Sequence, residues 1–419
     1  MRARATETET MQNTPDASAT APRAPAFAGI KVLDFSHQAA GPWATTLLGD
    51  LGADVVKIEK PGRGDSIRYA QGDESFEVGS LNFWGLNRSK RGITIDISTD
   101  EGRALVKRMA ATADVVLENF RPGVMDRQGI GYEALSAINP RLVYCGITAF
   151  GSVGPMAQKP GMDLILQATG GVMGLTGESA GRPPVKAAPP VADISTGIYG
   201  AYAVAAALFE RERSGCGQKI EIAMLDAVIS LLSDVALKSV VWDRDFEPFG
   251  SGHPDIVPYQ AFKARDGWFI VACLTNAFWK RLPAAIGHPE LLDDTRFTAM
   301  RDRVKNKSAL IEILNSIFAD ADRESWISRI EVADIPTCKV NTVREVFALE
   351  QTKVNQTLVR VPHPTRGEIP ILNCPVKLLG SPGKVERGAP GLGQHTDEVL
   401  ASYGVDAAEL ARLHGLGII

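Results

Sequence analysis

The sequence predicts an α/β protein built on an open, mostly parallel sheet. Short apolar segments alternate with segments of helical length from Phe27 onward, and glycines or prolines separate many of them. The first strand–helix–strand series reads as a βαβ unit, which joins parallel strands by a right-handed crossover. A Rossmann-like domain is therefore expected, in which ligands bind beyond the carboxyl ends of the strands.

The first half of the chain supplies most of this sheet. Gly52 is expected to end the first helix, and Asp193, a favoured N-cap residue, is expected to begin a long helix that ends at Ser214-Gly215. The expected strands are 30–35, 55–59, 93–97, 114–117, 142–147 and 218–223, and the other expected helices are 41–51, 100–111 and 224–237.

The sequence pattern changes near residue 240. A loop rich in proline and glycine at 246–258 precedes two strands, 259–263 and 268–272, which flank the hairpin signal Asp266-Gly267. Helices are expected at 278–286, 307–318, 323–331 and, near the end of the chain, 397–403. The expected organisation is a disordered tail (1–26), a large Rossmann-like domain (27–239), a small α+β domain (240–335) and a return to the large domain (336–419).

Composition excludes several classes of protein. With 419 residues the chain is too long for one ordinary core, and its net charge of −4 argues against general nucleic-acid binding. No apolar run is expected to reach the length of a membrane span. The five cysteines are scattered without a C-x-x-C pair, and the N-terminal segment lacks the apolar core of a secretion signal, so a cytoplasmic protein is expected.

The segments that follow the strands are glycine-rich or basic, as a ligand-binding edge requires. The first strand–helix turn lacks G-x-G-x-x-G, however, which argues against a nicotinamide or flavin dinucleotide bound in the usual way. Gly391-Leu392-Gly393 matches half of that motif but follows no expected strand.

Asp193 has two interpretations. An aspartate at a helix start commonly caps the free N–H groups of the first turn, and the helix field then favours its ionised form. A carboxylate exposed at such a junction can instead act as a nucleophile. The residues alone leave both possibilities open.

Several short motifs, taken in order and at their spacings, resemble the family III CoA-transferases, the superfamily that includes formyl-CoA transferase, carnitine CoA-transferase and α-methylacyl-CoA racemase. The resemblance covers nearly the whole folded chain. It rests on Gly41-Pro42, the segment 51–59, Asn87-Arg88-Ser89-Lys90-Arg91, Glu118-Asn119-Phe120-Arg121-Pro122-Gly123, Asp163, Gln167-Ala168, Asp193 and Gly215-Cys216-Gly217-Gln218.

The resemblance implies a fold and a chemistry. The fold would be a large Rossmann-like domain built from both chain ends plus a small domain, in an interlocked homodimer. Asp193 would be the catalytic nucleophile, forming an acyl anhydride and then an aspartyl-CoA thioester. Coenzyme A would be substrate and product, with no permanent cofactor, no metal, and a small carboxylic acid as the other partner. Succinyl-CoA as donor and a dicarboxylic or hydroxydicarboxylic acceptor are the expected substrates.

The resemblance also assigns further site residues. Asp163 would be an acidic partner of Asp193, and Gly250, Gly252 and His253 would form a substrate or lid loop. Formyl-CoA transferases have glutamine where this chain has Ala39, so a glutamine amide at the reacting centre is in doubt. The implied CoA-binding residues are His37, Gln38, Ala39, Ala40, Lys60, Lys90, Arg91, Asn119, Phe120, Arg121 and Arg127.

Two alternatives stay open. An α-methylacyl-CoA racemase needs an acid and a base on opposite faces of the α-carbon, but no histidine occurs between His37 and His253, and Met162 precedes Asp163 where the racemases have histidine. A catalytically silent CoA-binding homologue would bind CoA without transferring it.

Overall fold

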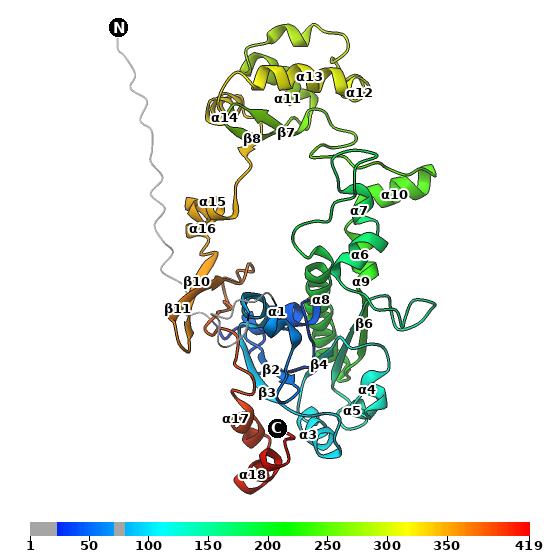
Figure 1. Ribbon diagram of the computed structural model, residues 1–419, viewed down its shortest axis with the longest axis vertical. Helices are drawn as coiled ribbons and strands as arrows, with labels where there is room; N and C mark the ends of the chain where they lie inside the picture. The colour runs from blue at the N-terminus through cyan, green and yellow to red at the C-terminus, as the bar shows by residue number, and fades with distance from the viewer. Residues whose placement is uncertain (1–22, 71–79) are drawn as a thin grey trace, which may run out of the picture.

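The computed structural model describes residues 23–70 and 80–419, and its centre is a six-stranded parallel sheet (Figure 1). The order β3-β2-β1-β4-β5-β6 places the first strand in the middle, as in doubly wound folds. The predicted parallel α/β sheet is confirmed, whereas most of the expected 1–26 tail lies outside the described residues. The strands are β1 (Lys31–Asp34), β2 (Asp54–Glu59), β3 (Lys90–Thr94), β4 (Val115–Glu118), β5 (Val143–Thr148) and β6 (Lys219–Ala223).

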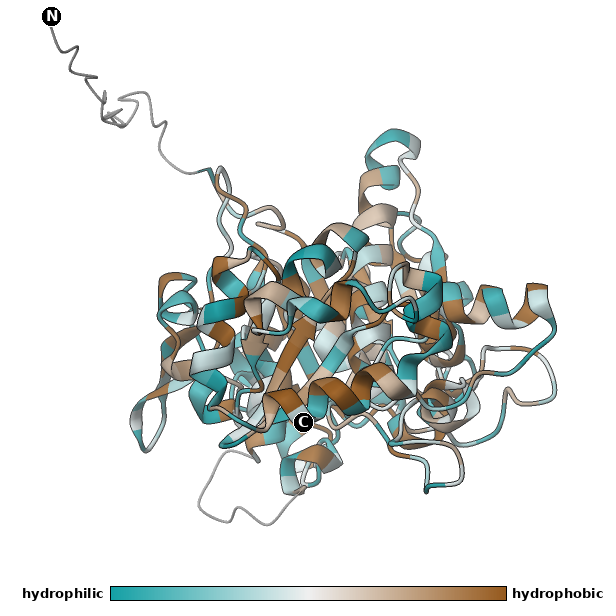
Figure 2. Ribbon diagram, turned by 90° about the horizontal axis from the view of Figure 1, so that it is seen from above, coloured by the Kyte–Doolittle hydropathy of each residue, from teal (hydrophilic) through white to brown (hydrophobic). Residues whose placement is uncertain are grey.

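Alternate residues of the strands enter two different cores. Leu33 and Val116 belong to a cluster that also contains residues of α3 (Asp100–Ala110), α17 (Thr396–Ser402) and α18 (Ala407–Gly415). Val32 and Val115 belong to the opposite cluster, together with residues of α1 (Ala40–Asp50), α8 (Val191–Ser214) and α9 (Met224–Ser230). Strands buried on both faces are typical of parallel sheets. Figure 2 shows brown, hydrophobic ribbon among paler segments in the middle of the molecule.

Other helices of this part of the chain complete its secondary structure. They are η1 (Ser66–Tyr69), α2 (Leu81–Asn87), α4 (Val124–Arg127), α5 (Tyr132–Ser136), α6 (Asp163–Thr169), α7 (Val172–Leu175) and α10 (Ser233–Trp242).

A separate apolar core lies in the segment from Val257 to Ile335. It packs helices on a three-stranded antiparallel sheet, β7-β8-β9, around aromatic side chains such as Phe269 and Phe318, whose ring centroids are 5.0 Å apart. The elements are β7 (Tyr259–Ala264), β8 (Gly267–Ala272), α11 (Asn276–Ala285), η2 (Pro289–Leu292), α12 (Met300–Lys305), α13 (Lys307–Phe318), α14 (Arg323–Val332) and β9 (Thr337–Lys339).

Two stretches of chain connect this unit to the large sheet. In Figure 1 the outgoing stretch follows α10, and the returning stretch carries α15 and α16 and then the hairpin β10-β11, so the chain outlines an open ring. These returning elements are α15 (Val343–Ala348), α16 (Glu350–Val354), β10 (Leu358–His363) and β11 (Gly367–Leu372).

Several sequence expectations need correction. The helix expected at 224–237 is two helices, because the chain turns at 231–232 and Ser233 has a positive φ of 49°. The strand expected at 93–97 begins at Lys90. The sequence did not indicate this start, because a lysine is rarely buried in a strand as Lys90 is in β3. The short helices α6 and α12 and the last helix α18 were not expected.

Helix α8 also overturns the expectation about apolar runs. Its 24 residues are long and apolar enough to span a membrane by length and composition. One face of it packs on α1 through glycines, while Tyr202 on another face is 70% exposed. A Cβ at Gly197 would lie 2.7 Å from the carbonyl oxygen of Ala40, and one at Gly200 would lie 3.0 Å from the Cβ of Ala44.

This close approach predicts the effect of adding one methyl group. Gly197→Ala should lower the free energy of unfolding by about 1–3 kcal/mol, since α1 and α8 must separate to admit the Cβ. Gly85→Ala in α2 is the control, because nothing lies within 4 Å of its Cβ position and alanine favours a helix. Denaturant unfolding of both variants measures the difference, and equal stabilities would contradict the α1–α8 packing.

Candidate functional site

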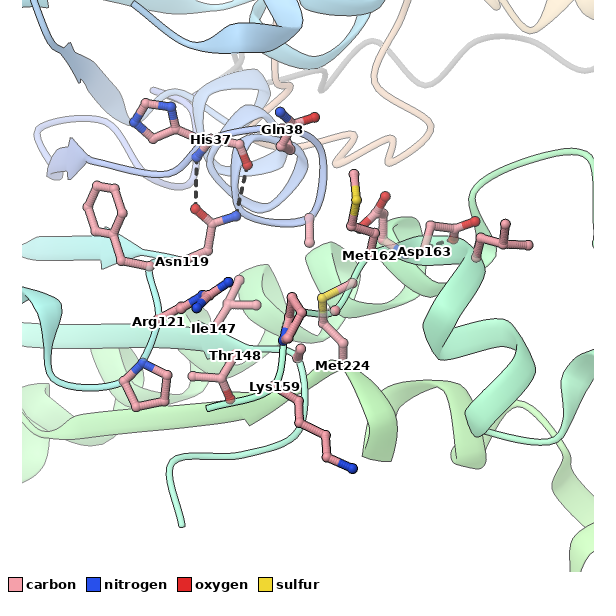
Figure 3. A pocket seen from close by; sticks show the side chains of 18 of the residues that line it. His37, Gln38, Asn119, Arg121, Ile147, Thr148, Lys159, Met162, Asp163 and Met224 are labelled. Atoms are coloured by element: carbon pink, nitrogen blue, oxygen red, sulfur yellow. Dashed lines mark hydrogen bonds between the residues drawn. The ribbon is translucent and has the colours of Figure 1, made fainter. Parts of the chain in front are cut away.

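A cavity of about 640 Å³ lies beyond the carboxyl ends of the central strands. Its walls come from the turn after β1, the turn after β4, the end of β5, helix α6 and the first turn of α8 (Figure 3). The predicted residues that line it are His37, Gln38, Ala40, Asn119, Phe120, Arg121, Asp163 and Asp193. Ligand sites of open α/β sheets occupy this edge.

Asp193 is the third residue of α8, not its N-cap, which is Pro190. The capping contact comes instead from Asp163, whose Oδ1 accepts hydrogen bonds from the N–H groups of Ala192 (2.9 Å) and Asp193 (3.4 Å). Asp163 is held in turn by Gln167, whose Nε2 donates to its Oδ2 at 2.7 Å. The carboxylate of Asp193 thus remains available to the cavity.

The expectation that the helix field keeps Asp193 ionised is not met. Burial, together with the nearby negative charge of Asp163, raises the pKa of Asp193 to about 7. Desolvation therefore outweighs the field of the helix N-terminus. A carboxyl with this pKa is divided between its acid and its carboxylate form near neutral pH.

The turn after β1, which contains His37 and Gln38, forms one wall of the cavity. Asn119 fixes the backbone of His37 on both sides, since its Oδ1 accepts from the His37 N–H and its Nδ2 donates to the His37 carbonyl, both at 2.8 Å (Figure 3). Phe120 lies beside the His37 ring with its centroid 5.5 Å away. Ala39 lies behind this wall and is buried as the N-cap residue of α1.

A second cavity of about 280 Å³ continues from the first, with His37 and Phe120 lining both. It contains Lys60 at the end of β2 and Arg63, which the sequence reasoning did not single out. Lys60 is 63% exposed and its Nζ lies 3.8 Å from Asp96. The two cavities together extend from the half-buried Asp193 carboxylate to a basic, solvent-facing end.

Lys90 and Arg91 are not brought to this groove. The Nζ of Lys90 donates to Asp34 (2.9 Å) and to the Pro42 carbonyl (2.9 Å) while the residue is only 1% exposed, and burial lowers its pKa to about 8. Arg91 pairs with Asp54 at 2.7 Å and with Glu398 at 3.1 Å. Both positive charges are compensated inside the fold, so the structure gives no contact that supports the predicted phosphate role.

Other predicted residues also lie outside the two cavities. Arg127 is exposed on α4 beside the turn at Gly123. The carbonyl of His253 accepts from the Lys307 Nζ at 3.3 Å, and its Nδ1 accepts from the Asp255 N–H. Gly250 and Gly252 belong to the same loop and line neither cavity. The Gly250 N–H donates to the Gly177 carbonyl at 3.0 Å, whereas Gly252 lies beside Lys307 and Gln260 of the small unit.

Several lining residues were not among the predicted site residues. Met162 and Met224 supply apolar surface, and Lys159 and Lys186 supply positive charge. Lys186 lies in the proline-rich turn before α8, where its Nζ donates to the carbonyls of Ala187 and Ala188. No pattern distinguishes these lysines from surface lysines in the sequence.

Comparison with known proteins decides the family. The model of CoA-transferase family III matches residues 27–396. The chain belongs to CoA-transferase family III.

Known relatives are similar to this family III chain over most of their length. A succinyl-CoA:glutarate CoA-transferase of Mus musculus is 35% identical over 372 residues, covering 89% of this chain and 85% of the mouse protein. A succinate–glutarate CoA-transferase of Agrobacterium fabrum is 35% identical over 384 residues, covering 90% and 96%. The crystal structure of a CaiB/BaiF family protein from Brucella suis superposes with a TM-score of 0.81 at 36% identity, covering 91% and 100%.

The raised pKa of Asp193 predicts a pH-dependent effect on stability. The unfolded carboxyl titrates near pH 3.9, so between about pH 4 and pH 7 the folded family III chain binds more protons than the unfolded chain. Ionised Asp193 therefore destabilises the fold increasingly as the pH rises through this window. Asp193→Asn should be more stable than the parent at pH 8, by on the order of 1–2 kcal/mol given its partial exposure, and equal to it at pH 4.

Denaturant unfolding at the two pH values measures this difference. Asp226→Asn is the matched control, because Asp226 also lies in a first helical turn but is exposed and outside the cavity. A gain that is the same at both pH values would contradict the raised pKa.

Proposed function

We propose that the protein moves coenzyme A from an acyl-CoA to a free carboxylic acid, with Asp193 as the nucleophile. The observation that carries the proposal is the joining of three features in one groove: a half-buried carboxylate, the His37–Gln38 turn, and a basic outer end with Lys60 and Arg63. CoA presents a thioester at one end and phosphates at the other, which matches this order. Membership of the CoA-transferase family and the named activities of its relatives support the same reaction.

The proposed chemistry balances without a permanent cofactor or a metal. The Asp193 carboxylate attacks the thioester carbonyl, the C–S bond breaks, and CoA leaves as a thiolate while a mixed anhydride forms. The thiolate then attacks the aspartyl carbonyl, giving an aspartyl-CoA thioester and the free donor acid. The acceptor carboxylate reverses these two steps and leaves as the new acyl-CoA, which restores Asp193. Because the anhydride hydrolyses readily, the site must exclude water.

Asp163 acts in this proposal as a positioning residue and as a source of negative charge. It caps the first turn of α8 and so fixes the direction of the Asp193 side chain. Its charge also disfavours ionisation of Asp193. The free enzyme should therefore react faster with acyl-CoA as the pH rises through about 7.

The proposed substrates are succinyl-CoA and a short dicarboxylic acid. The relatives from mouse and Agrobacterium are named for succinyl-CoA or succinate together with glutarate. Arg121, Lys159 and Lys186 add positive charge to the cavity walls, and a second carboxylate on a substrate needs such a partner.

We also infer an interlocked homodimer with the domain organisation expected from the sequence. One core joins residues from Leu33 to Tyr144 with residues from Val399 to Ile419, which supports a large domain made from both chain ends. The small unit has its own core and two connections, which supports a ring that a second chain can thread (Figure 1). Tyr202, Val240 and Leu379 are 70%, 81% and 92% exposed, so a second copy would cover apolar surface. We assign the enzyme to the cytoplasm, consistent with its free cysteines.

Replacement of Asp193 tests the nucleophile. Asp193→Ala and Asp193→Asn should each lower the transfer rate by at least about 10³-fold, since no covalent intermediate can form, while the Kd for CoA changes little. Transfer is measured by mass spectrometry of product thioesters from a panel of acyl-CoAs and free acids, and Asp226→Asn should retain full activity.

Three results would contradict this assignment. Substantial transfer by Asp193→Ala would remove the nucleophile. Exchange of the α-hydrogen of a 2-methylacyl-CoA with solvent deuterium, in the absence of transfer, would indicate a racemase. Binding of CoA with neither reaction in the parent enzyme would indicate a silent homologue.

Subunit exchange tests the interlocked dimer. Light scattering should give twice the chain mass, and a mixture of tagged and untagged folded enzyme should form no hybrid dimer, since threaded rings separate only when they unfold. Unfolding and refolding the mixture together should then produce hybrids. Hybrids that form without denaturant would exclude threading, and a monomer at micromolar concentration would exclude the dimer.

A further inference from the structure

A buried ion pair lies beneath the His37–Gln38 turn. Lys57 on β2 and Asp65 after the strand are both fully buried, and the Lys57 Nζ lies 3.1 Å from an Asp65 carboxylate oxygen. Neither residue lines either cavity of the groove. A buried pair of this kind contributes little net stability relative to apolar residues of the same volume, because both ions lose their hydration. Stability alone is therefore a weak reason for its presence in a central strand.

The pair also contacts the turn, while Asp65 caps η1 by accepting from the Ile67 N–H at 3.1 Å. The Lys57 Nζ donates to the carbonyl oxygen of Ser36 at 2.7 Å. Both carboxylate oxygens of Asp65 accept from the N–H of Gln38, at 3.2 and 3.1 Å. The Asp65 carboxylate also lies 3.7 Å from the Nδ1 of His37. The two residues thus hold the turn from below, on the side away from the cavity.

The turn needs such support because of its backbone conformation. Gln38 has φ +64°, in the left-handed region that a residue with a Cβ occupies at a cost of about 1–2 kcal/mol. The carboxylate of Asp65 stabilises this conformation by accepting the Gln38 N–H. Helix α1 begins two residues later at Ala40, whose carbonyl oxygen lies against Gly197 of α8, the helix that carries Asp193.

We propose that Lys57 and Asp65 are positioning residues, which hold the left-handed His37–Gln38 turn opposite Asp193. This inference rests on the proposed function only in that the cavity is the site of CoA transfer. Weakening the pair displaces the wall that faces the thioester, and it lets water compete with the CoA thiolate for the anhydride. Hydrolysis of acyl-CoA should then rise relative to transfer.

The chain contains a matched pair that separates positioning from general stabilisation. Asp50 and Arg88 are also fully buried, with 2.6 Å between the Arg88 Nη2 and an Asp50 carboxylate oxygen. Asp50 accepts further hydrogen bonds from Arg88 and from Ser89, and within the described part of the chain none of its hydrogen bonds reaches residues 36–38. Asp50→Asn thus disturbs a buried ion pair without touching the turn.

The first experiment compares Asp65→Asn with Asp50→Asn. Both should lower the melting temperature, because each leaves a buried cation without its charged partner. Per folded enzyme, Asp65→Asn should lower kcat about tenfold or more and raise the ratio of hydrolysis to transfer, with a smaller change in KM for acyl-CoA. Asp50→Asn should leave kcat and that ratio unchanged. Equal kinetic effects of the two variants would assign Lys57 and Asp65 to stability alone.

The second experiment uses the backbone of residue 38. Gln38→Gly and Gln38→Ala both remove the side chain, but only glycine adopts a positive φ without strain. Adding Asp65→Asn should lower kcat in both backgrounds. The fold-loss of kcat should be at least about threefold smaller in the glycine background than in the alanine background. The same loss in both backgrounds would overturn the proposal.

A second variant and a hydrogen-exchange measurement also test the positioning role. If Asp65→Asn does not fold, Lys57→Gln replaces it in the same design, since Lys57 holds the Ser36 carbonyl. Hydrogen exchange of the peptide that contains residues 36–41 should accelerate in the Asp65 or Lys57 variant and not in Asp50→Asn. Because exchange needs no activity, it can support or overturn the positioning role even if Asp193→Ala retains transfer and the nucleophile assignment fails.

Discussion

The close packing of α8 on α1 is the constraint on which the site depends. Gly197 and Gly200 let the two helices approach until backbone meets backbone, and this fixes the first turn of α8 opposite the start of α1. Asp193 lies one turn before the first of these glycines, and Ala40 begins the facing helix. The distance between Asp193, the proposed nucleophile, and the turn is thus set by glycines in the core rather than by residues in the cavity. A site built this way is rigid, as positioning of reacting groups requires.

The same arrangement gives Asp193 conflicting electrostatic influences. The N-terminus of α8 favours a negative charge, whereas burial and Asp163 disfavour it, and the pKa of about 7 indicates that the second influence prevails. A partly desolvated carboxylate loses hydration that would otherwise have to be removed before it attacks a carbonyl carbon. The proposed nucleophile therefore exchanges part of its ionisation, and some stability of the fold, for reactivity.

The sequence predicted the sheet and much of the cavity, because both follow from local patterns. Strand–helix alternation places the segments after β1, β4 and β5 at one edge, which is why His37 and Asn119 meet although they are far apart in sequence. The predictions fail where a residue far away in the sequence determines the local structure. Asp193 was read as an N-cap because the sequence does not indicate that Asp163, thirty positions earlier, caps α8 from another helix. Met162 and Lys159 carry no signal that predicts where they point.

Buried charges mark the limit of such prediction most clearly. Cationic residues in a strand-like segment suggest solvent exposure, yet Lys57 and Lys90 are as buried as the valines around them. Each ammonium group donates to a backbone carbonyl at the β1–α1 junction, that of Ser36 in the connection for Lys57 and that of Pro42 in the first turn of α1 for Lys90. An apolar side chain in either position would fill the same volume and leave that carbonyl without its donor. The two lysines therefore fix the shape of a connection that apolar packing alone would leave undetermined, and this shape forms one wall of the groove in which Asp193 lies.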